Sequence, residues 1–134
     1  MEESNLMIQE YAKNPLCNYT MEDYSVKQQE WNFICGDDIS VYLRIEDNKI
    51  VEYSFDGNSS SITIASASFL SEFIIWKDLA EVLTWSYNNM LAWWFEVSPR
   101  RKRAAVIAIL AVRNAIHNYL KDWIEDTFDD VLDD

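Results

Sequence analysis

The sequence predicts an α+β fold, in which helices pack mainly on one face of a three-stranded antiparallel sheet. Three observations lead to this expectation: an alternating apolar pattern in the first half, a turn that sends the chain back, and apolar residues at helical spacing in the second half. The 134 residues suit one domain spanning 1–134. An apolar content of 49% and an aromatic content of 14% favour a globular chain over a disordered one.

The first half of the chain predicts a short helix followed by the sheet. A helix is expected over residues 5–13, and it ends before Pro15 because proline disfavours helix in the residue ahead of it. Residues 14–24 carry no regular pattern, and "VKQQEWNFIC" can be extended. The next strand alternates apolar and polar residues, and "EDNK" is a turn into the returning strand "IVEYSF". The apolar members of the alternation are Ile39, Val41, Leu43 and Ile45.

The second half predicts helices. Apolar residues at helical spacing cover 64–74, and Ser59, Ser60 or Ser61 can cap this helix. The segment 76–95 is interpreted as a second helix with a more irregular aromatic end, and a long helix is expected to start just after Pro99. The tail is interpreted as an acidic helical extension from about residue 121. Its residues at helical spacing are Trp123, Ile124, Phe128, Val131 and Leu132.

Charge and hydropathy exclude some classes of partner. The net charge of −12 opposes phosphate binding, so no nucleic-acid partner is expected. The longest apolar run, Ala104 to Val112, is far shorter than the roughly 20 residues that span a bilayer. The acidic start "MEESNLMIQEY" lacks the apolar core of a secretory signal, so a cytoplasmic location and free thiols are expected. Two cysteines and one histidine are too few for a zinc site of the CxxC type.

Several segments together carry a resemblance to a known family. They are "KNP" at 13–15, "CGDDISVYLRIEDNKIVEYSFDG" at 35–57, "ASAS" at 65–68 with Glu72 beyond it, and "PRRKR" at 99–103. In this combination and spacing they resemble the NifU/IscU/SufU family of scaffold proteins for iron–sulfur cluster assembly. The resemblance covers roughly residues 5 to 120. It implies a SufE/NifU-like fold and a scaffold rather than an enzyme, with a cysteine desulfurase and other iron–sulfur assembly proteins as partners.

The resemblance also implies a site of three cysteines and one aspartate at one end of the fold, which holds an iron–sulfur cluster or zinc. Cys35 and Asp37 match the first cysteine and the aspartate. Ser60 and Ala104 stand at the positions of the other two cysteines. Because clusters are held mainly by thiolates and serine and alanine are poor or absent ligands, the sequence predicts a degenerate cluster or metal site.

Two alternatives remain open beside a scaffold with a degenerate site. In a SufE-like role Cys35 would be the acceptor of a persulfide sulfur, with Asp37 raising the pKa of its thiol and Arg101 or Arg103 lowering it. In a regulatory role the chain would dock on a cysteine desulfurase without chemistry. Shared ligation by Cys35 from two chains is also open, and the aromatic segment "WSYNNMLAWWF" would suit a homodimer interface if exposed. Cys17 and His117 lie outside the ligand positions and are expected to be ordinary residues.

Overall fold

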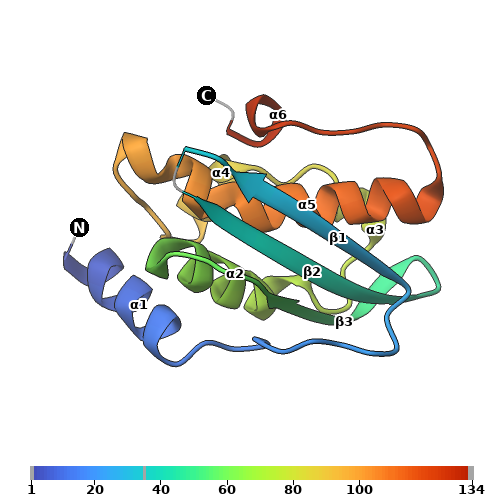
Figure 1. Cartoon of the computed structure of the whole chain (residues 1–134), viewed down its shortest axis with the longest axis horizontal. Coiled ribbons are helices and arrows are strands. Elements are labelled where there is room, and N and C mark those ends of the chain that lie inside the picture. Colours follow the sequence, from blue (N-terminus) through green and yellow to red (C-terminus); the bar gives the residue numbers. More distant parts are fainter. Residues whose placement is uncertain (1, 35, 133–134) are drawn as a thin grey trace.

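The computed structural model describes residues 2–34 and 36–132 and is shown in Figure 1. Its elements follow the predicted order of a helix, three strands and then helices. They are α1 (Glu2–Lys13), β1 (Val26–Asn32), β2 (Asp37–Glu46), β3 (Lys49–Asp56), α2 (Ser61–Ile74), α3 (Leu79–Val82), α4 (Tyr87–Ala92), the 3-10 turn η1 (Pro99–Arg101), α5 (Lys102–Leu120) and α6 (Phe128–Leu132).

The sheet has the order β1–β2–β3, and both pairings are antiparallel, as predicted. Val41 in the central strand lies opposite Gln28 of β1 and Phe55 of β3. The hairpin turn is made by Asp47 and Asn48, which both have positive φ, the conformation that matches the twist of the flanking strands. The alternating residues of β2 form the inner face of the sheet, where Ile39, Val41 and Leu43 are fully buried.

The helices cover one face of this sheet, as predicted. α5 packs on β1 and β2, and α2 packs on β3 and on α5, so the two long helices lie side by side across the sheet (Figure 1). α1 packs on α2 rather than on the strands. The apolar run Ala104 to Val112 is buried inside α5 as part of the core. Within the described residues, none of the helices combines the length and the apolar character that a membrane span requires.

The irregular segment 14–25 passes along the edge strand β3 and onto the outer face of the sheet. The amide of Phe55 donates to the carbonyl of Cys17 at 3.0 Å, and the amide of Ser25 donates to the carbonyl of Leu43 at 2.7 Å. The ring of Tyr24 lies 5.6 Å from that of Tyr42, which explains why this outward-facing tyrosine of β2 is buried. The segment therefore lacks regular structure but is tied to the sheet.

The prediction of one helix over 76–95 was wrong, because the chain forms the two short helices α3 and α4 there. A new helix starts at Ser86, whose hydroxyl accepts from the amide of Asn88 while the side chain of Asn89 accepts from the amide of Ser86. Such a capping box satisfies amides that a continuous helix would bond internally. Trp94 has positive φ just after the end of α4. Most aromatic side chains of the segment turn into the core, whereas Trp76 and Trp94 are largely exposed.

The prediction of a helical extension from about residue 121 was also wrong, except for the short α6. Lys121 has a left-handed conformation that ends α5, and the chain then returns along this helix without regular structure until residue 128. Asp126 holds the returning segment, because its carboxylate lies 2.9 Å from Nε of Arg113 and 3.0 Å from Nε2 of His117. Val131 of α6 is fully buried against the body of the protein. The ion pairs of Asp126 with α5 thus hold residues 121–127 in a non-helical conformation, although the apolar residues of the tail have helical spacing.

Candidate functional site

The predicted ligand positions belong to three segments, which are the β1–β2 turn, the loop between β3 and α2, and the start of α5. The first two are joined by a set of hydrogen bonds around Asp38. Its amide donates to the carbonyl of Asn58 at 3.0 Å, and its own carbonyl accepts from the hydroxyl of Ser59 at 2.6 Å. Gly57 makes this approach possible, because a Cβ atom there would lie 2.6 Å from the carbonyl oxygen of Asp38. The loop is therefore fixed against the first residues of β2.

Asp37 is buried and its carboxylate is fully engaged at the start of α2. One oxygen accepts from the amide of Ser60 at 2.7 Å. The other accepts from the hydroxyl of Ser60 at 3.1 Å and from the hydroxyl of Thr63 at 2.9 Å. Ser60 is the N-cap of α2 but makes no side-chain cap, since its hydroxyl donates to Asp37. A carboxylate at a helix N-terminus is favoured by the helix dipole, so this arrangement stabilises α2.

Ala104 is brought to the same region by contacts between α2 and α5. The hydroxyl of Ser66 donates to the carbonyl of Ala104 at 3.1 Å and lies 3.0 Å from the carbonyl of Thr63. Ser66 and Ala104 are both almost completely buried. The first turn of α5 is thus joined to the same turn of α2 that carries Thr63.

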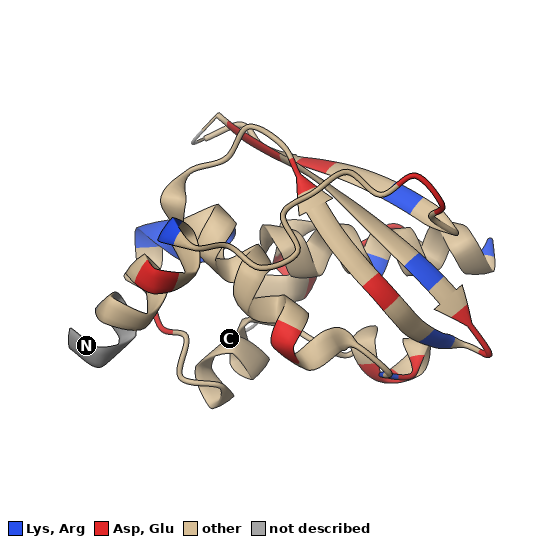
Figure 2. Cartoon of the chain, turned by 90° about the horizontal axis from the view of Figure 1, so that it is seen from below, with Lys and Arg blue, Asp and Glu red and all other residues tan. Residues whose placement is uncertain are grey.

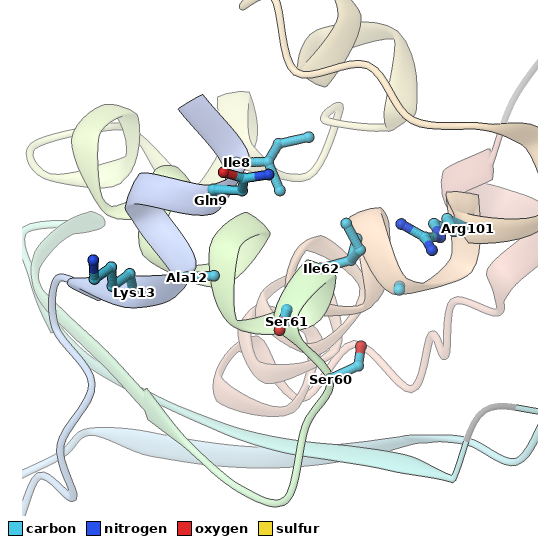
Figure 3. Close-up of a pocket in the computed structure, with 9 residues that line it drawn as sticks. Ile8, Gln9, Ala12, Lys13, Ser60, Ser61, Ile62 and Arg101 are labelled. Carbon is cyan, nitrogen blue, oxygen red and sulfur yellow. The ribbon is translucent and has the colours of Figure 1, made fainter. Parts of the chain in front are cut away.

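Ser60 and Ala104 line one hollow of about 820 Å³ between the starts of α2 and α5 and the inner side of α1. We call it the ligand-position hollow, and Figure 3 shows its lining side chains. Its remaining residues are Ile8, Gln9, Ala12, Lys13, Ser61, Ile62 and Arg101. The guanidinium of Arg101 points toward Ile62 in this view. Asp37 is hydrogen-bonded to Ser60, and Ser60 lines the same hollow as Ala104. The three residues are therefore close together at one end of the fold.

Cys35, the predicted sulfur acceptor and cluster or metal ligand, lies outside the described residues. Its neighbours in sequence are Ile34, which is exposed, and Gly36, whose amide donates to the carbonyl of Asn32 at 2.9 Å. Among the side chains that the structure describes, in residues 6–34 and 36–132, no three of His, Cys, Asp or Glu gather closely enough to share a metal ion. Of the four ligand positions that the resemblance predicts, Cys35 and Asp37 are the two predicted ligands, and both oxygens of Asp37 already accept hydrogen bonds.

Arg101 and Arg103, the two arginines expected to lower the pKa of the Cys35 thiol, line different hollows. Arg101 lines the ligand-position hollow, whereas Arg103 lines two other hollows and places its guanidinium 4.8 Å from the ring centre of Phe128. Figure 2 shows acidic residues spread over the strands, turns and helices, with fewer basic residues among them. Arg101 and Lys13 are the charged residues that line the ligand-position hollow, so its lining is positive although the chain as a whole is acidic.

Thr63 and Ser66 are site residues that sequence reasoning missed. Both hydroxyls lie within the apolar helix α2, three residues apart, and both are buried against polar partners. The signal in the sequence is the spacing of hydroxyl residues at i and i+3 inside "ITIASAS", which indicates one polar line along an otherwise apolar helix. Its meaning depends on partners 26 and 38 residues away, which no local pattern identifies.

Cys17 and His117, which were expected to be ordinary residues, lie away from the ligand-position hollow. Burial raises the pKa of the Cys17 thiol, which is half-buried at a residue with positive φ. His117 lies between Asp122 and Asp126, with its two ring nitrogens 2.8 Å and 3.0 Å from their carboxylate oxygens. Neither residue lines the ligand-position hollow.

The fold and the position of these loops define a NifU-like domain. The crystal structure of the N-terminal part of a NifU-like protein from Brucella abortus superposes with a TM-score of 0.73. The alignment covers 87% of this chain and 93% of that one at 16% identity, so it shows the fold. The family model of the NifU-like N terminal domain matches residues 3–125, and the chain therefore belongs to this family. The predicted family resemblance is confirmed.

Curated relatives share part of this sequence. The iron–sulfur cluster assembly scaffold protein IscU of Thermotoga maritima is 32% identical over 77 residues, which are 58% of this chain and 54% of that protein. The zinc-dependent sulfurtransferase SufU of Bacillus subtilis is 30% identical over 87 residues, or 63% of this chain and 58% of that protein. The matches thus span little more than half the length of each relative.

Proposed function

We propose that this chain is a cytoplasmic iron–sulfur cluster assembly protein of the NifU/IscU type whose cluster or metal site is degenerate. The observation that carries the proposal is the bonding of Asp37. Both carboxylate oxygens accept hydrogen bonds from Ser60 and Thr63, so the carboxylate serves as an anchor for α2. Ser60 and Ala104, which line the adjoining hollow, offer a hydroxyl and a methyl group where the family has thiols.

The residues present do not fit a resident zinc ion or cluster within one chain. Zinc takes about four nitrogen, sulfur or oxygen ligands, and iron–sulfur clusters are held mainly by thiolates. The family positions supply one thiol and one carboxylate that is already bonded. The proposed function therefore involves no step through a bound metal and depends on the fold that the chain shares with the NifU-like family rather than on metal binding.

A restored ligand set tests the degenerate site. After anaerobic incubation with iron and sulfide, or with zinc, we expect wild-type protein to retain far less than one metal per chain. The variant Ser60→Cys/Ala104→Cys should retain about one zinc per chain, because it combines two new thiols with Cys35 and Asp37. Metal analysis and native mass spectrometry measure the metal content per chain of both proteins. Native mass spectrometry also separates monomers from dimers that share a cluster. Adding Cys35→Ser to the restored variant should remove the gain, whereas a stoichiometric cluster on the wild-type monomer contradicts the proposal.

A second candidate function is a sulfur acceptor that uses Cys35. The observation that favours it is the position of Arg101, since a guanidinium near the ligand positions would favour a thiolate over a thiol. In the proposed step, the Cys35 thiolate attacks the outer sulfur of a persulfide on a cysteine desulfurase. A new sulfur–sulfur bond forms at Cys35, the bond within the enzyme's persulfide breaks, and the cysteine of the enzyme leaves as a thiolate. No further oxidant or reductant is needed.

Intact-mass measurement tests this step. After incubation with a cysteine desulfurase and cysteine, wild-type protein should gain about the mass of one sulfur atom, because the transfer adds a single sulfur. Cys35→Ser should gain none, while Cys17→Ser should behave as wild type and serves as the matched control. A gain that persists in Cys35→Ser contradicts the acceptor role. Stable binding to the desulfurase without any gain in mass would instead support the regulatory alternative.

A further inference from the structure

A second hollow lies near the start of α5, and among the described residues its cations have no ion-pair partner and one of its amides has no hydrogen-bond partner. It has a volume of about 520 Å³, and we call it the basic hollow. It lies between the end of β1, the turn η1, the first residues of α5 and α6. The lining residues are Asn32, Ile34, Pro99, Arg100, Lys102 and Arg103, with Leu132 at the margin.

The cations of the basic hollow lack acidic partners within the described part of the chain. No ion pair joins Arg100, Lys102 or Arg103 to a described carboxylate, although acidic residues outnumber basic ones by 23 to 11 in the whole sequence. Lys102 and Arg103 instead lie over the rings of Tyr87 and Phe128. The first turn of α5 has no acidic residue, so positive side chains stand at a helix end that is itself positive. This local repulsion would be relieved by an anion.

Asn32 gives an independent sign of a missing partner. It is only 1% exposed, yet its Nδ2 atom has no hydrogen-bond partner among the described residues. Buried polar groups are nearly always paired, because an unpaired donor loses its hydration without compensation. Asn32 lines the basic hollow together with Arg100 and Arg103. A ligand oxygen in the hollow would satisfy the amide and the cations together.

The surroundings of the hollow indicate that the anion belongs to a protein. Phe33 and Ile34, at the tip of the β1–β2 turn, are 87% and 78% exposed, and the ring of Trp31 stacks on Phe33 at 6.4 Å. Exposed apolar side chains next to a cleft are typical of protein-binding surfaces. The volume exceeds what one carboxylate fills, and Pro99 and Leu132 add apolar walls. A carboxylate side chain flanked by apolar residues complements this surface in charge and in shape.

We propose that the basic hollow binds an acidic and apolar segment of a partner protein, with a carboxylate held by Asn32, Arg100 and Arg103 and apolar side chains on Phe33 and Ile34. This site adds to the proposed function and needs neither a metal nor the Cys35 thiol. A failed sulfur transfer would leave this proposal intact, and a failed peptide experiment would leave the proposed function intact.

The test is a titration of isotope-labelled protein with the peptide acetyl-Leu-Asp-Val-Glu-Leu-amide, followed by NMR. We expect saturable binding that shifts the side-chain amide signals of Asn32. The matched peptide with asparagine and glutamine in place of the acidic residues should bind about tenfold more weakly, because charge-assisted hydrogen bonds are lost. Sodium sulfate is the probe for a small inorganic oxyanion. If it binds as well as the acidic peptide, the assignment to a protein segment is overturned.

Two double variants with the same change in net charge complete the test. Arg100→Gln/Arg103→Gln should weaken binding of the acidic peptide by about tenfold. Lys77→Gln/Lys121→Gln alters cations outside the basic hollow and should change binding by no more than about twofold, as expected for screened surface charges. Equal weakening in both variants, an unmoved Asn32 amide, or no binding at millimolar peptide overturns the proposal.

Discussion

Gly57 shows how a single residue sets the geometry of the ligand-position end. Its φ of 138° lies in the region that residues with side chains rarely adopt, and a Cβ atom would come within 2.9 Å of the backbone of both Asp38 and Ile39. The loop after β3 can therefore approach β2 closely enough for Ser60 to reach Asp37 only when residue 57 is glycine. Gly36 differs, because it has a φ of 73° and open space around its Cα.

We predict that Gly57→Ala lowers the free energy of unfolding by about 2–3 kcal/mol, because it combines backbone strain with a steric clash. Gly36→Ala is the matched control and should cost about 1 kcal/mol, the cost of a left-handed conformation without a clash. Urea unfolding followed by tryptophan fluorescence measures both. Equal losses in the two variants would contradict the role of the close approach.

The returning tail is an element whose place is set by polar groups. The side chain of Asp126 is 10% exposed and lies between Arg113 and His117, and Asn114 donates to the carbonyl of Asp126 at 3.1 Å while accepting from its amide at 2.7 Å. The pKa of Asp122 is lowered mainly by a hydrogen bond from the amide of Ile124 and then by His117. The residues after α5 are thus held by side chains of α5, and α6 follows as a short helix packed against the core.

We predict that Asp126→Asn lowers the free energy of unfolding by about 3 kcal/mol, because it removes the carboxylate partner of Arg113, whose side chain is only 13% exposed. Asp129→Asn removes a charge from the same tail at an exposed position and should change stability by less than about 0.5 kcal/mol. Urea unfolding gives the free energies, and the NMR signals of the Val131 methyl groups report whether α6 stays docked. A tail that remains docked with full stability in Asp126→Asn would show that the apolar contacts of α6 suffice.

On the scale of the whole molecule, two phenols tie the first 25 residues to the body of the protein. Tyr11 of α1 donates to the carboxylate of Glu72 on α2, which raises the pKa of its phenol to about 12. Tyr19 donates to Glu52 of β3 at 2.6 Å, and its pKa is likewise raised to about 12. Because these values are raised, the contribution of each bond to stability is complete below the ordinary pKa of 10.0 and is lost as the pH rises through about 12.

We predict that Glu72→Gln moves the pKa of Tyr11 back toward 10.0 and leaves that of Tyr19 unchanged. Glu52→Gln should do the reverse, so each variant is the control for the other. Labelled tyrosine ring carbons, followed by NMR between pH 8 and 13, resolve the two titrations. If both phenols shift in either variant, general charge repulsion in this acidic protein, rather than the specific bond, controls their ionisation.

The local patterns predicted most of the fold and failed where distant partners decide. The strand alternation of β2, the turn at Asp47 and Asn48, and the long apolar helix α5 were predicted from neighbouring residues. The helix over 76–95 was mispredicted because apolar spacing continues across Ser86, where side-chain capping starts a new helix. In the site, the family resemblance indicated Asp37, Ser60 and Ala104. It gave no indication of Thr63, whose hydroxyl donates to Asp37 from 26 residues away.

The amino-acid sequence by itself determined the α+β order of elements and the membership of the NifU-like family, and it is the basis for proposing that two ligand thiols of the family are missing. These properties depend on residue identity and on spacing within a few residues, so they can be read without coordinates. Only the tertiary structure decided that Asp37 bonds to Ser60 and Thr63, that the tail returns along α5, and that Asn32 lines a hollow whose cations have no ion-pair partner among the described residues. Each of these depends on which distant groups become neighbours, because burial makes every polar group compete for the partners that the fold brings within reach.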